Sequence, residues 1–325
     1  MIMFRKLTLL AVVWTLCVVV LGAYVRLSDA GLGCPDWPGC YGKATPIHAV
    51  DEILAAHAEA PHGPVSMAKA WKEMVHRYLA SALGLLVLVL AVMAVKHRDR
   101  LRQSPLLAVS IFFVVCFQGA LGMWTVTKLL KPAIVTSHLI GGMTLVAMLT
   151  WLALRQRDWA RVERAGGFRL AAFVGLLVVT CQIILGGWVS TNYAAVVCTD
   201  FPTCQGALVP QMDFRDAFHV LRELGQTPEG ELLSMANLTA IHWLHRLGAL
   251  VTFCFIGILS WRLYAQGVLR SLALAIAGML LVQVGLGISN VVFHLPLSVA
   301  VLHNAGAAML LLLMVVLNYR LAQCR

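Results

Sequence analysis

The segment LGAYVRLSDAGLGCPDWPGCYG at residues 21–42 has a second copy, LGGWVSTNYAAVVCTDFPTCQG, at residues 185–206. The two copies align without a gap. The residues that the first copy shares with the second are Leu21, Gly22, Val25, Ala30, Cys34, Asp36, Pro38, Cys40 and Gly42. A duplicated segment of this length predicts that the chain consists of two halves with the same order of parts.

Polar motifs extend the repeat beyond this segment. The pair His76–Arg77 corresponds to His245–Arg246, and His138 corresponds to His303. The pattern Gln-x-x-Leu-Gly begins at residues 118, 182 and 283. Glycine allows two membrane helices to approach closely, and glutamine can hydrogen-bond across them. We therefore interpret this pattern as a helix-packing motif.

The composition places most of the chain in lipid. The 325 residues are 60% hydrophobic and 12% charged, with a mean hydropathy of +0.82, whereas soluble domains carry about 25% charged residues. Apolar stretches long enough to cross a bilayer as helices recur at residues 7–26, 74–95, 105–127, 133–154, 170–190, 238–260, 272–293 and 297–318. The sequence predicts an all-α membrane protein of eight transmembrane helices.

These spans divide evenly between the two copies of the repeat. Because four spans is an even number, both halves enter the membrane from the same side, and a pseudo-twofold axis would lie along the membrane normal. We expect a four-helix bundle in residues 1–160 and a second in residues 161–325.

Charge gives the expected orientation. Arg5 and Lys6 precede the first span, and the basic runs KHRDRLR (96–102) and RQRDWARVERAGGFR (155–169) join later spans. Short basic loops stay on the cytoplasmic side, which predicts both termini inside. The net charge of +10 follows from this topology and does not indicate a nucleic-acid partner. A cleaved signal peptide is the alternative for the first span, but that span occupies the position of the fifth.

Two cysteine pairs fall in outer loops, where disulfides form readily. Cys34 and Cys40 lie between spans one and two, and Cys198 and Cys204 lie between spans five and six. We predict a disulfide in each loop, and a redox-active pair at Cys34–Cys40 stays open. A zinc site would need four ligands, and neither loop has a second cysteine pair.

Four of the 11 histidines lie near the outer ends of even-numbered spans: His76, His138, His245 and His303. Each half supplies two of them, from parallel helices and at matching depth. Such a pair can hold a flat macrocycle in a bundle core, and histidine is a standard axial ligand of haem iron. The alternative is a set of hydrogen-bonded packing residues. Carboxylates do not accompany the pairs, which disfavours transport of divalent metals.

Charged residues adjoin these histidines. Arg77 and Arg246 stand where arginine can bind haem propionates or extend to the membrane interface. Glu73 shares a helix face with His76, while His242 takes the same position before His245. The Glu73 carboxylate is either a proton acceptor or stabiliser of positive charge beside a cofactor, or an ordinary acid at a helix start. The asymmetry suggests that one haem is acted upon and the other passes electrons.

The chain resembles the haem A synthase family, as a bacterial-type member. The resemblance rests on RLSDAGLGCPDWPGC (26–40), Glu-x-x-His-Arg (73–77), His-Arg (245–246), the later His138 and His303, and the eight-span repeat. It implies conversion of haem O to haem A, in which the methyl group at porphyrin position 8 becomes a formyl group. The implied steps are successive hydroxylations with oxygen from water, followed by dehydration.

The resemblance also implies roles for single residues. His76 and His138 would be the axial ligands of the substrate haem, and His245 and His303 those of a haem b. Glu73 matches the catalytic carboxylate of the family. The pairs Cys34–Cys40 and Cys198–Cys204 match its two outer-loop cysteine pairs.

The implied location is the bacterial inner membrane, with haem pockets and cysteine loops toward the periplasm. Expected partners are membrane lipid, a haem O synthase as haem donor and terminal-oxidase assembly factors. The electron acceptor and the oligomeric state, a homo-oligomer included, stay open.

Two other functions fit the same features. One is a diheme b-type cytochrome that passes electrons between quinone and a partner and leaves its haems unchanged. The other is a haem carrier or assembly factor without turnover. Outside the spans, residues 213–225 place Phe214, Phe218 and Leu221 on one face, which predicts a short interfacial helix.

Overall fold

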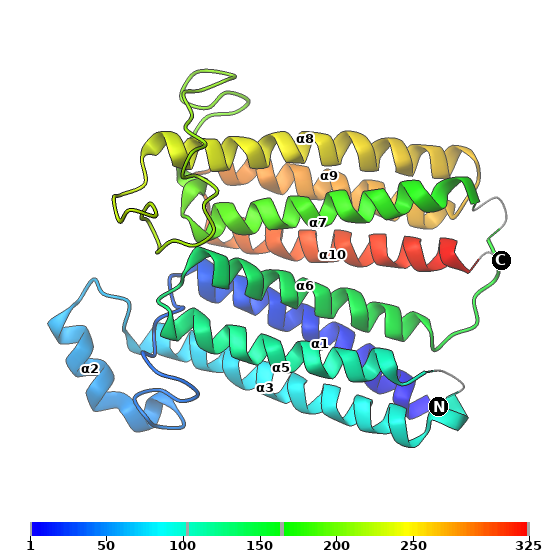
Figure 1. Cartoon of the computed structure of the whole chain (residues 1–325), viewed down its shortest axis with the longest axis horizontal. Helices are drawn as coiled ribbons and strands as arrows, with labels where there is room; N and C mark the ends of the chain where they lie inside the picture. The colour runs from blue at the N-terminus through cyan, green and yellow to red at the C-terminus, as the bar shows by residue number, and fades with distance from the viewer. Residues whose placement is uncertain (1, 102–103, 163–165, 324–325) are drawn as a thin grey trace. The chain divides into compact units, whose positions relative to one another are not determined.

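A computed structural model describes residues 2–101, 104–162 and 166–323, and these residues form helices and no strand. Eight helices are long and apolar enough to cross a membrane (Figure 1): α1 (Ile2–Leu27), α3 (Met67–Lys96), α5 (Leu106–Thr127), α6 (Pro132–Leu154), α7 (Arg169–Thr191), α8 (Met235–Ala265), α9 (Arg270–Val292) and α10 (Leu297–Ala322). The short helices are η1 (Pro46–Ala49), α2 (Val50–Glu59), α4 (Arg98–Leu101), η2 (Gly166–Phe168) and η3 (Ala194–Val196). The predicted all-α class and the eight predicted spans are confirmed.

The helices α3 and α8 begin earlier than the apolar pattern predicted. The Ser66 hydroxyl caps α3 by accepting a hydrogen bond from the Lys69 N–H at 3.3 Å. Ser234 and Asn237 form a reciprocal capping box at the start of α8. Because these first turns are polar, hydropathy does not mark them, although the caps stabilise them as helix.

Large apolar side chains are exposed along the spans, among them Leu85, Phe113, Leu170 and Leu281. Exposed apolar side chains on helices whose backbone groups are satisfied internally fit a lipid surrounding. The chain is therefore a multi-pass membrane protein. The orientation of its spans stays a prediction, and parts of both basic runs (Arg102 and residues 163–165) lie outside the described residues.

The chain divides into two compact units, Met1–Leu145 and Val146–Arg325. In the first unit, α1 packs against α3, and α3 packs against α5. Gln118 of α5 donates a hydrogen bond to the His138 carbonyl of α6 at 2.8 Å. A Cβ atom on Gly142 of α6 would lie 3.4 Å from Val19 of α1, so α6 also approaches α1 at this point.

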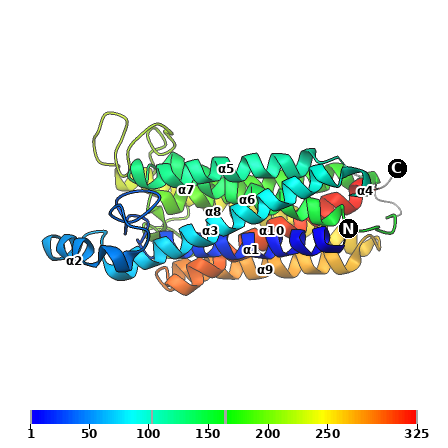
Figure 2. The same cartoon turned by 90° about the horizontal axis from the view of Figure 1, so that it is seen from below.

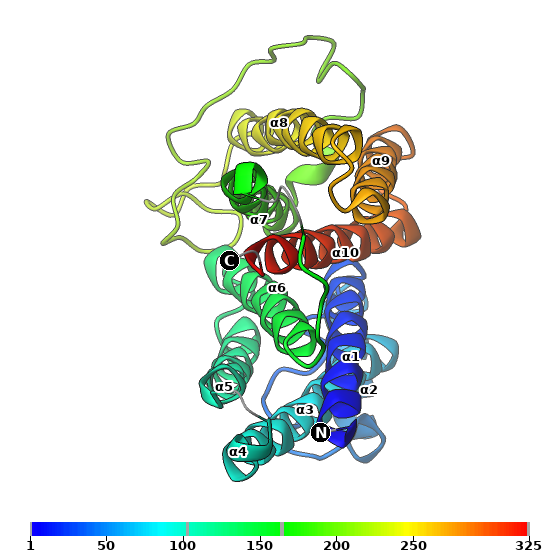
Figure 3. The ribbon, with the colours of Figure 1, turned by 90° about the vertical axis from the view of Figure 1, so that its right-hand side faces the viewer.

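The second unit is a ring of four helices in chain order. Each of α7, α8 and α9 packs against the next helix, and α10 returns to α7, as the end-on view shows (Figure 3). The Asn318 amide of α10 donates to the Ala172 carbonyl of α7 at 3.0 Å. The two units thus have the same internal order of helices. The boundary at 160/161 and the pseudo-twofold axis stay predictions.

The loop between α1 and α3 contains an element that the sequence analysis did not predict. Helix α2 lies beyond the end of α3 (Figure 2), and its Ile53 is fully buried in a cluster with Cys34, Cys40 and Met74. Helix α2 therefore anchors the cysteine loop on the N-terminal end of α3. Its one buried apolar residue is too weak a pattern for a helix prediction.

The predicted helix at 213–225 is wrong, since this segment forms turns without a helix. It is held by side chains from the end of α7. The Arg222 guanidinium donates to the Asn192 amide oxygen at 2.5 Å and stacks 5.6 Å above the Trp188 ring. The Trp188 indole N–H donates to the Ala217 carbonyl at 2.9 Å. Tertiary contacts override the local amphipathic pattern here.

We expect Gly33→Ala to destabilise the first unit. A Cβ atom at Gly33 would lie 2.6 Å from the backbone of Lys69 and Ala70 at the start of α3. Overpacking of this kind costs about 1–3 kcal/mol. Gly84→Ala, within α3, is the control, because its Cβ would meet no atom within 4 Å. Thermal unfolding of the purified protein in detergent should show a lower Tm for Gly33→Ala alone. An equal Tm for both variants would contradict this packing.

Candidate active site

Each candidate histidine rests on a glycine of the preceding odd-numbered span. The pairs are Gly22 of α1 with His76 of α3, Gly122 of α5 with His138 of α6, Gly186 of α7 with His245 of α8, and Gly287 of α9 with His303 of α10. A Cβ atom on these glycines would lie between 2.9 and 3.4 Å from the Cε1 atom of the ring. The absence of a side chain on the glycine therefore creates the space that the imidazole fills.

Each unit brings its own two histidines within electrostatic reach of each other, His76 with His138 and His245 with His303. The Nδ1 atoms of His76, His138 and His303 are buried, and no described residue hydrogen-bonds them. A buried polar atom without a partner costs about 1–3 kcal/mol, so these rings are suited to a ligand. The described residues contain no group of three or more metal-binding side chains. Two neighbouring imidazoles suit the axial ligand pair of a haem.

Glu73 lies one helical turn before His76 and is only 4% exposed. Its Oε2 atom accepts a hydrogen bond from the Cys34 N–H at 2.9 Å, and its Oε1 atom pairs with the Arg77 guanidinium at 2.5 Å. The carboxylate is thus held by the cysteine loop on one side and by its own helix on the other. At the same helix position the second unit has His242, which is 5% exposed.

The first cysteine loop is closed by a Cys34–Cys40 disulfide, with 4.9 Å between the Cα atoms. The Asp36 carboxylate accepts hydrogen bonds from the N–H groups of Tyr41 and Gly42, both at 2.6 Å. Gly42 has a φ of +69°, a conformation that glycine adopts without steric cost. The shared Asp and Gly of the repeat are therefore turn residues.

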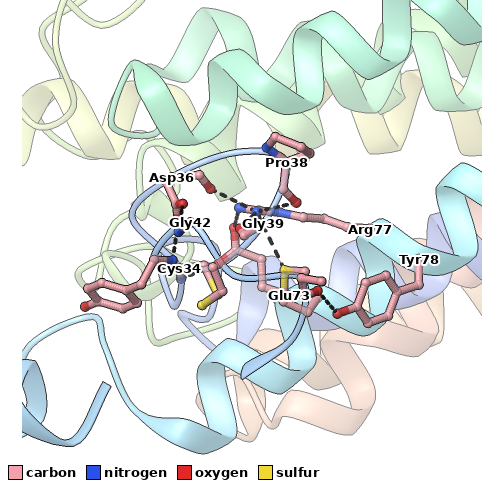
Figure 4. The surroundings of a disulfide bond; sticks show 12 residues. Cys34, Asp36, Pro38, Gly39, Gly42, Glu73, Arg77 and Tyr78 are labelled. Carbon is pink, nitrogen blue, oxygen red and sulfur yellow. Dashed lines mark hydrogen bonds and ion pairs between the residues drawn. A yellow bond between two sulfur atoms is a disulfide. The ribbon is translucent and has the colours of Figure 1, made fainter. Parts of the chain in front are cut away.

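Arg77 fastens this loop to α3 (Figure 4). Its Nη1 atom donates to the carbonyls of Asp36 at 2.9 Å and Gly39 at 2.6 Å, while its Nη2 atom reaches Glu73. One side chain thus joins the disulfide loop, the buried carboxylate and the helix that carries His76. The predicted propionate contact of Arg77 stays a prediction, and the sequence analysis missed this anchoring role.

The second unit has an equivalent disulfide loop. Cys198 and Cys204 form a disulfide, with 4.8 Å between the Cα atoms. The Asp200 carboxylate accepts from the N–H groups of Gln205 at 2.8 Å and Gly206 at 3.0 Å. Hydrogen bonds from the Thr203 hydroxyl and the Gly206 N–H lower the pKa of Asp200 to about 2. The carboxylate therefore keeps its charge, and the turn its cap, at all physiological pH values.

Arg246 fastens the second loop as Arg77 fastens the first. It donates to the Thr203 carbonyl at 2.8 Å and to the Asp200 carbonyl at 3.1 Å. Because His242 replaces the glutamate here, Arg246 binds the loop without a carboxylate on its own helix. Its contact with a propionate also stays a prediction. The sequence signal for both anchors was available, since each His-Arg pair follows a copy of the cysteine loop.

Membrane-spanning helices that carry a histidine pair and a disulfide loop in each unit define a class of helical membrane proteins whose histidines are suited to bind haem iron. A family described as "Cytochrome oxidase assembly protein" (COX15-CtaA) matches residues 5–315. The chain belongs to this family.

Curated relatives agree over most of the chain. A "Heme A synthase" of Shewanella oneidensis is 46% identical over 95% of this chain and 94% of its own length. A "Heme A synthase" of Caulobacter vibrioides is 28% identical over 90% of this chain and 88% of its own length. One of Halalkalibacterium halodurans is 27% identical over 70% of this chain and 71% of its own length. The similarity therefore covers both units.

We expect Arg77→Met to destabilise the protein more than Arg246→Met does. Arg77→Met leaves the Glu73 carboxylate buried without its cation, and breaking a buried ion pair costs about 3–5 kcal/mol. Arg246→Met removes hydrogen bonds to loop carbonyls and an attraction to Asp200, but Asp200 lies at the surface and stays solvated. Adding Glu73→Gln to Arg77→Met should recover part of the lost Tm, because no charge stays buried. Equal losses for the two arginine variants, or no recovery in the double variant, would contradict the Glu73–Arg77 pairing.

Proposed function

We propose that this chain is a haem A synthase, a membrane enzyme that oxidises a methyl group of haem O to the formyl group of haem A. The observation that carries the proposal is the 46% identity to a protein named "Heme A synthase" over 95% of the chain. The paired histidines of each unit support it, because they offer axial ligands for the substrate haem and for a second, resident haem.

In this proposal His76 and His138 hold the substrate haem, and Glu73 is the catalytic carboxylate beside it. Each hydroxylation with oxygen from water releases protons, and a buried carboxylate can accept one. The Cys34 N–H and Arg77 fix both oxygens of Glu73, so the group is held in place before the substrate arrives.

His245 and His303 would hold a haem b in the second unit, which supplies one-electron transfer when bound. The second unit has His242 where the first has Glu73, which supports this division, because no buried carboxylate stands at the matching position. The propionates of either haem would lie toward Arg77 or Arg246. The electrons pass to an acceptor outside the chain.

The proposal also covers location and partners. The chain would lie in a bacterial inner membrane with both termini in the cytoplasm. Its histidine pairs and disulfide loops would then lie toward the periplasmic side. A haem O synthase would supply the substrate, and assembly factors of a terminal oxidase would receive the product.

We expect Glu73→Gln to keep its haems and to lose conversion. Glutamine preserves the size of the side chain but cannot accept a proton as a carboxylate does, and loss of a general base lowers rates by about 10²–10⁴-fold. Extraction of pigment from the purified variant should give haem O in place of haem A. Glu52→Gln, on the exposed face of α2, is the control and should yield haem A. Undiminished haem A from Glu73→Gln would overturn the assigned role.

We expect His303→Ala to lose the haem b and to retain haem O or haem A in the first unit. Replacing an axial imidazole removes one of only two iron ligands from the site. Quantitative extraction of each pigment per protein measures this separation. His294→Ala, in the loop before α10, should bind both pigments. Haem B as the sole pigment of the wild-type protein would contradict the proposed function.

A further inference from the structure

Three of the four histidines are held by a glutamine from the neighbouring helix. The Nε2 atoms of these glutamines donate to the histidine carbonyls, Gln118 to His138 at 2.8 Å, Gln182 to His245 at 3.0 Å and Gln283 to His303 at 3.0 Å. Each glutamine lies one helical turn before the glycine on which the ring rests. One turn of α5, of α7 and of α9 therefore positions both the ring and the backbone of the histidine on the next helix.

A second glycine completes each of these contacts. It stands three residues after the histidine, at Gly141, Gly248 and Gly306. A Cβ atom on Gly141 would lie 2.7 Å from the Gln118 Oε1 atom, and one on Gly248 or Gly306 would also collide with its glutamine. The Oε1 atoms are buried and accept no hydrogen bond from the described residues, which fits a contact with the glycine Cα–H. We name this arrangement the glutamine clamp: Gln-x-x-x-Gly on one helix and His-x-x-Gly on the next.

His76 has no glutamine clamp. Val18 stands where the glutamine would be, one turn before Gly22, and Leu79 stands where the second glycine would be. Within the described part of the chain, no side chain donates to the His76 carbonyl. The nearest substitute is the Trp14 indole, which donates to the Leu79 carbonyl at 3.2 Å. His76 thus shares the glycine seat of the other three histidines and lacks the hydrogen bond that fixes their backbone.

Resting on the proposed function, we infer that His76 is the exchangeable axial ligand of the enzyme. A substrate haem enters and a product haem leaves in each catalytic cycle, so one ligand of the first unit has to release the iron. His76 releases it with the lone pair kept on the imidazole, while the clamped His138 stays bound. Both ligands of the second unit are clamped, as a haem that remains in place requires. Val18 and Leu79 act as positioning residues, because they occupy the two positions at which the other histidines have the glutamine and the glycine of the clamp.

Grafting the clamp onto His76 tests this inference. Val18→Gln with Leu79→Gly rebuilds both halves of the motif in the full-length protein. The readout is the rate of haem transfer to excess apomyoglobin, with pigment extraction to separate haem O and haem A from haem B. In wild type, haem O and haem A should leave faster than haem B. The graft should slow their transfer about threefold to tenfold, as expected for one added interhelical hydrogen bond, and leave haem B unchanged. Leu79→Gly alone is the matched control and should not slow transfer.

A converse variant tests the inference even if the grafted protein does not fold. Gln182→Val removes the clamp of His245, and haem B transfer should accelerate by a similar factor. Carbon monoxide binding to the reduced protein gives a spectroscopic check, because it reports an open iron position. It should bind the haem of the first unit in wild type and more slowly in the graft. Unchanged rates in the graft and in Gln182→Val would overturn the inference. The proposed function fails separately, if the wild-type pigment contains neither haem O nor haem A.

Discussion

The contact of an imidazole with a glycine of the neighbouring helix is the constraint on which the two bundles depend. A side chain as small as alanine at Gly22 or Gly186 would come within 3.0 Å of the His76 or His245 ring. Helices α1, α5, α7 and α9 therefore supply a glycine, and α3, α6, α8 and α10 supply the histidine that rests on it. The same contact sets how closely two helices approach and where the ring nitrogens lie, so helix packing and the placement of the imidazoles have one origin.

The cysteine loop and the candidate catalytic carboxylate form one connected structure in the first unit. The Cys34 N–H binds Glu73, Glu73 binds Arg77, and Arg77 binds the carbonyls of the loop. A change at the disulfide would thus reach the carboxylate through a single backbone hydrogen bond. The second unit keeps the loop and Arg246 but has no glutamate on the helix. The disulfide loop and its arginine anchor therefore form without the carboxylate.

Sequence reasoning succeeded where the signal is local. Hydropathy marked all eight spans, and the closely spaced cysteines marked both disulfides. It failed where a weak local pattern competes with tertiary contacts. Residues 213–225 resemble an amphipathic helix, but Arg222 and Trp188 hold them as turns. Helix α2 was missed for the opposite reason, because only its Ile53 is buried.

The sequence by itself determined the membrane class, the duplication and the identity of the histidines, because hydropathy and repeated motifs need no knowledge of packing. Only the tertiary structure decided the partners of the arginines and glutamines. Arg77 can reach a propionate, a lipid or a loop carbonyl with the same side chain, and Gln118 can bridge any close pair of helices. Which partner such a long polar side chain takes depends on helix register and loop placement, which are properties of the whole fold.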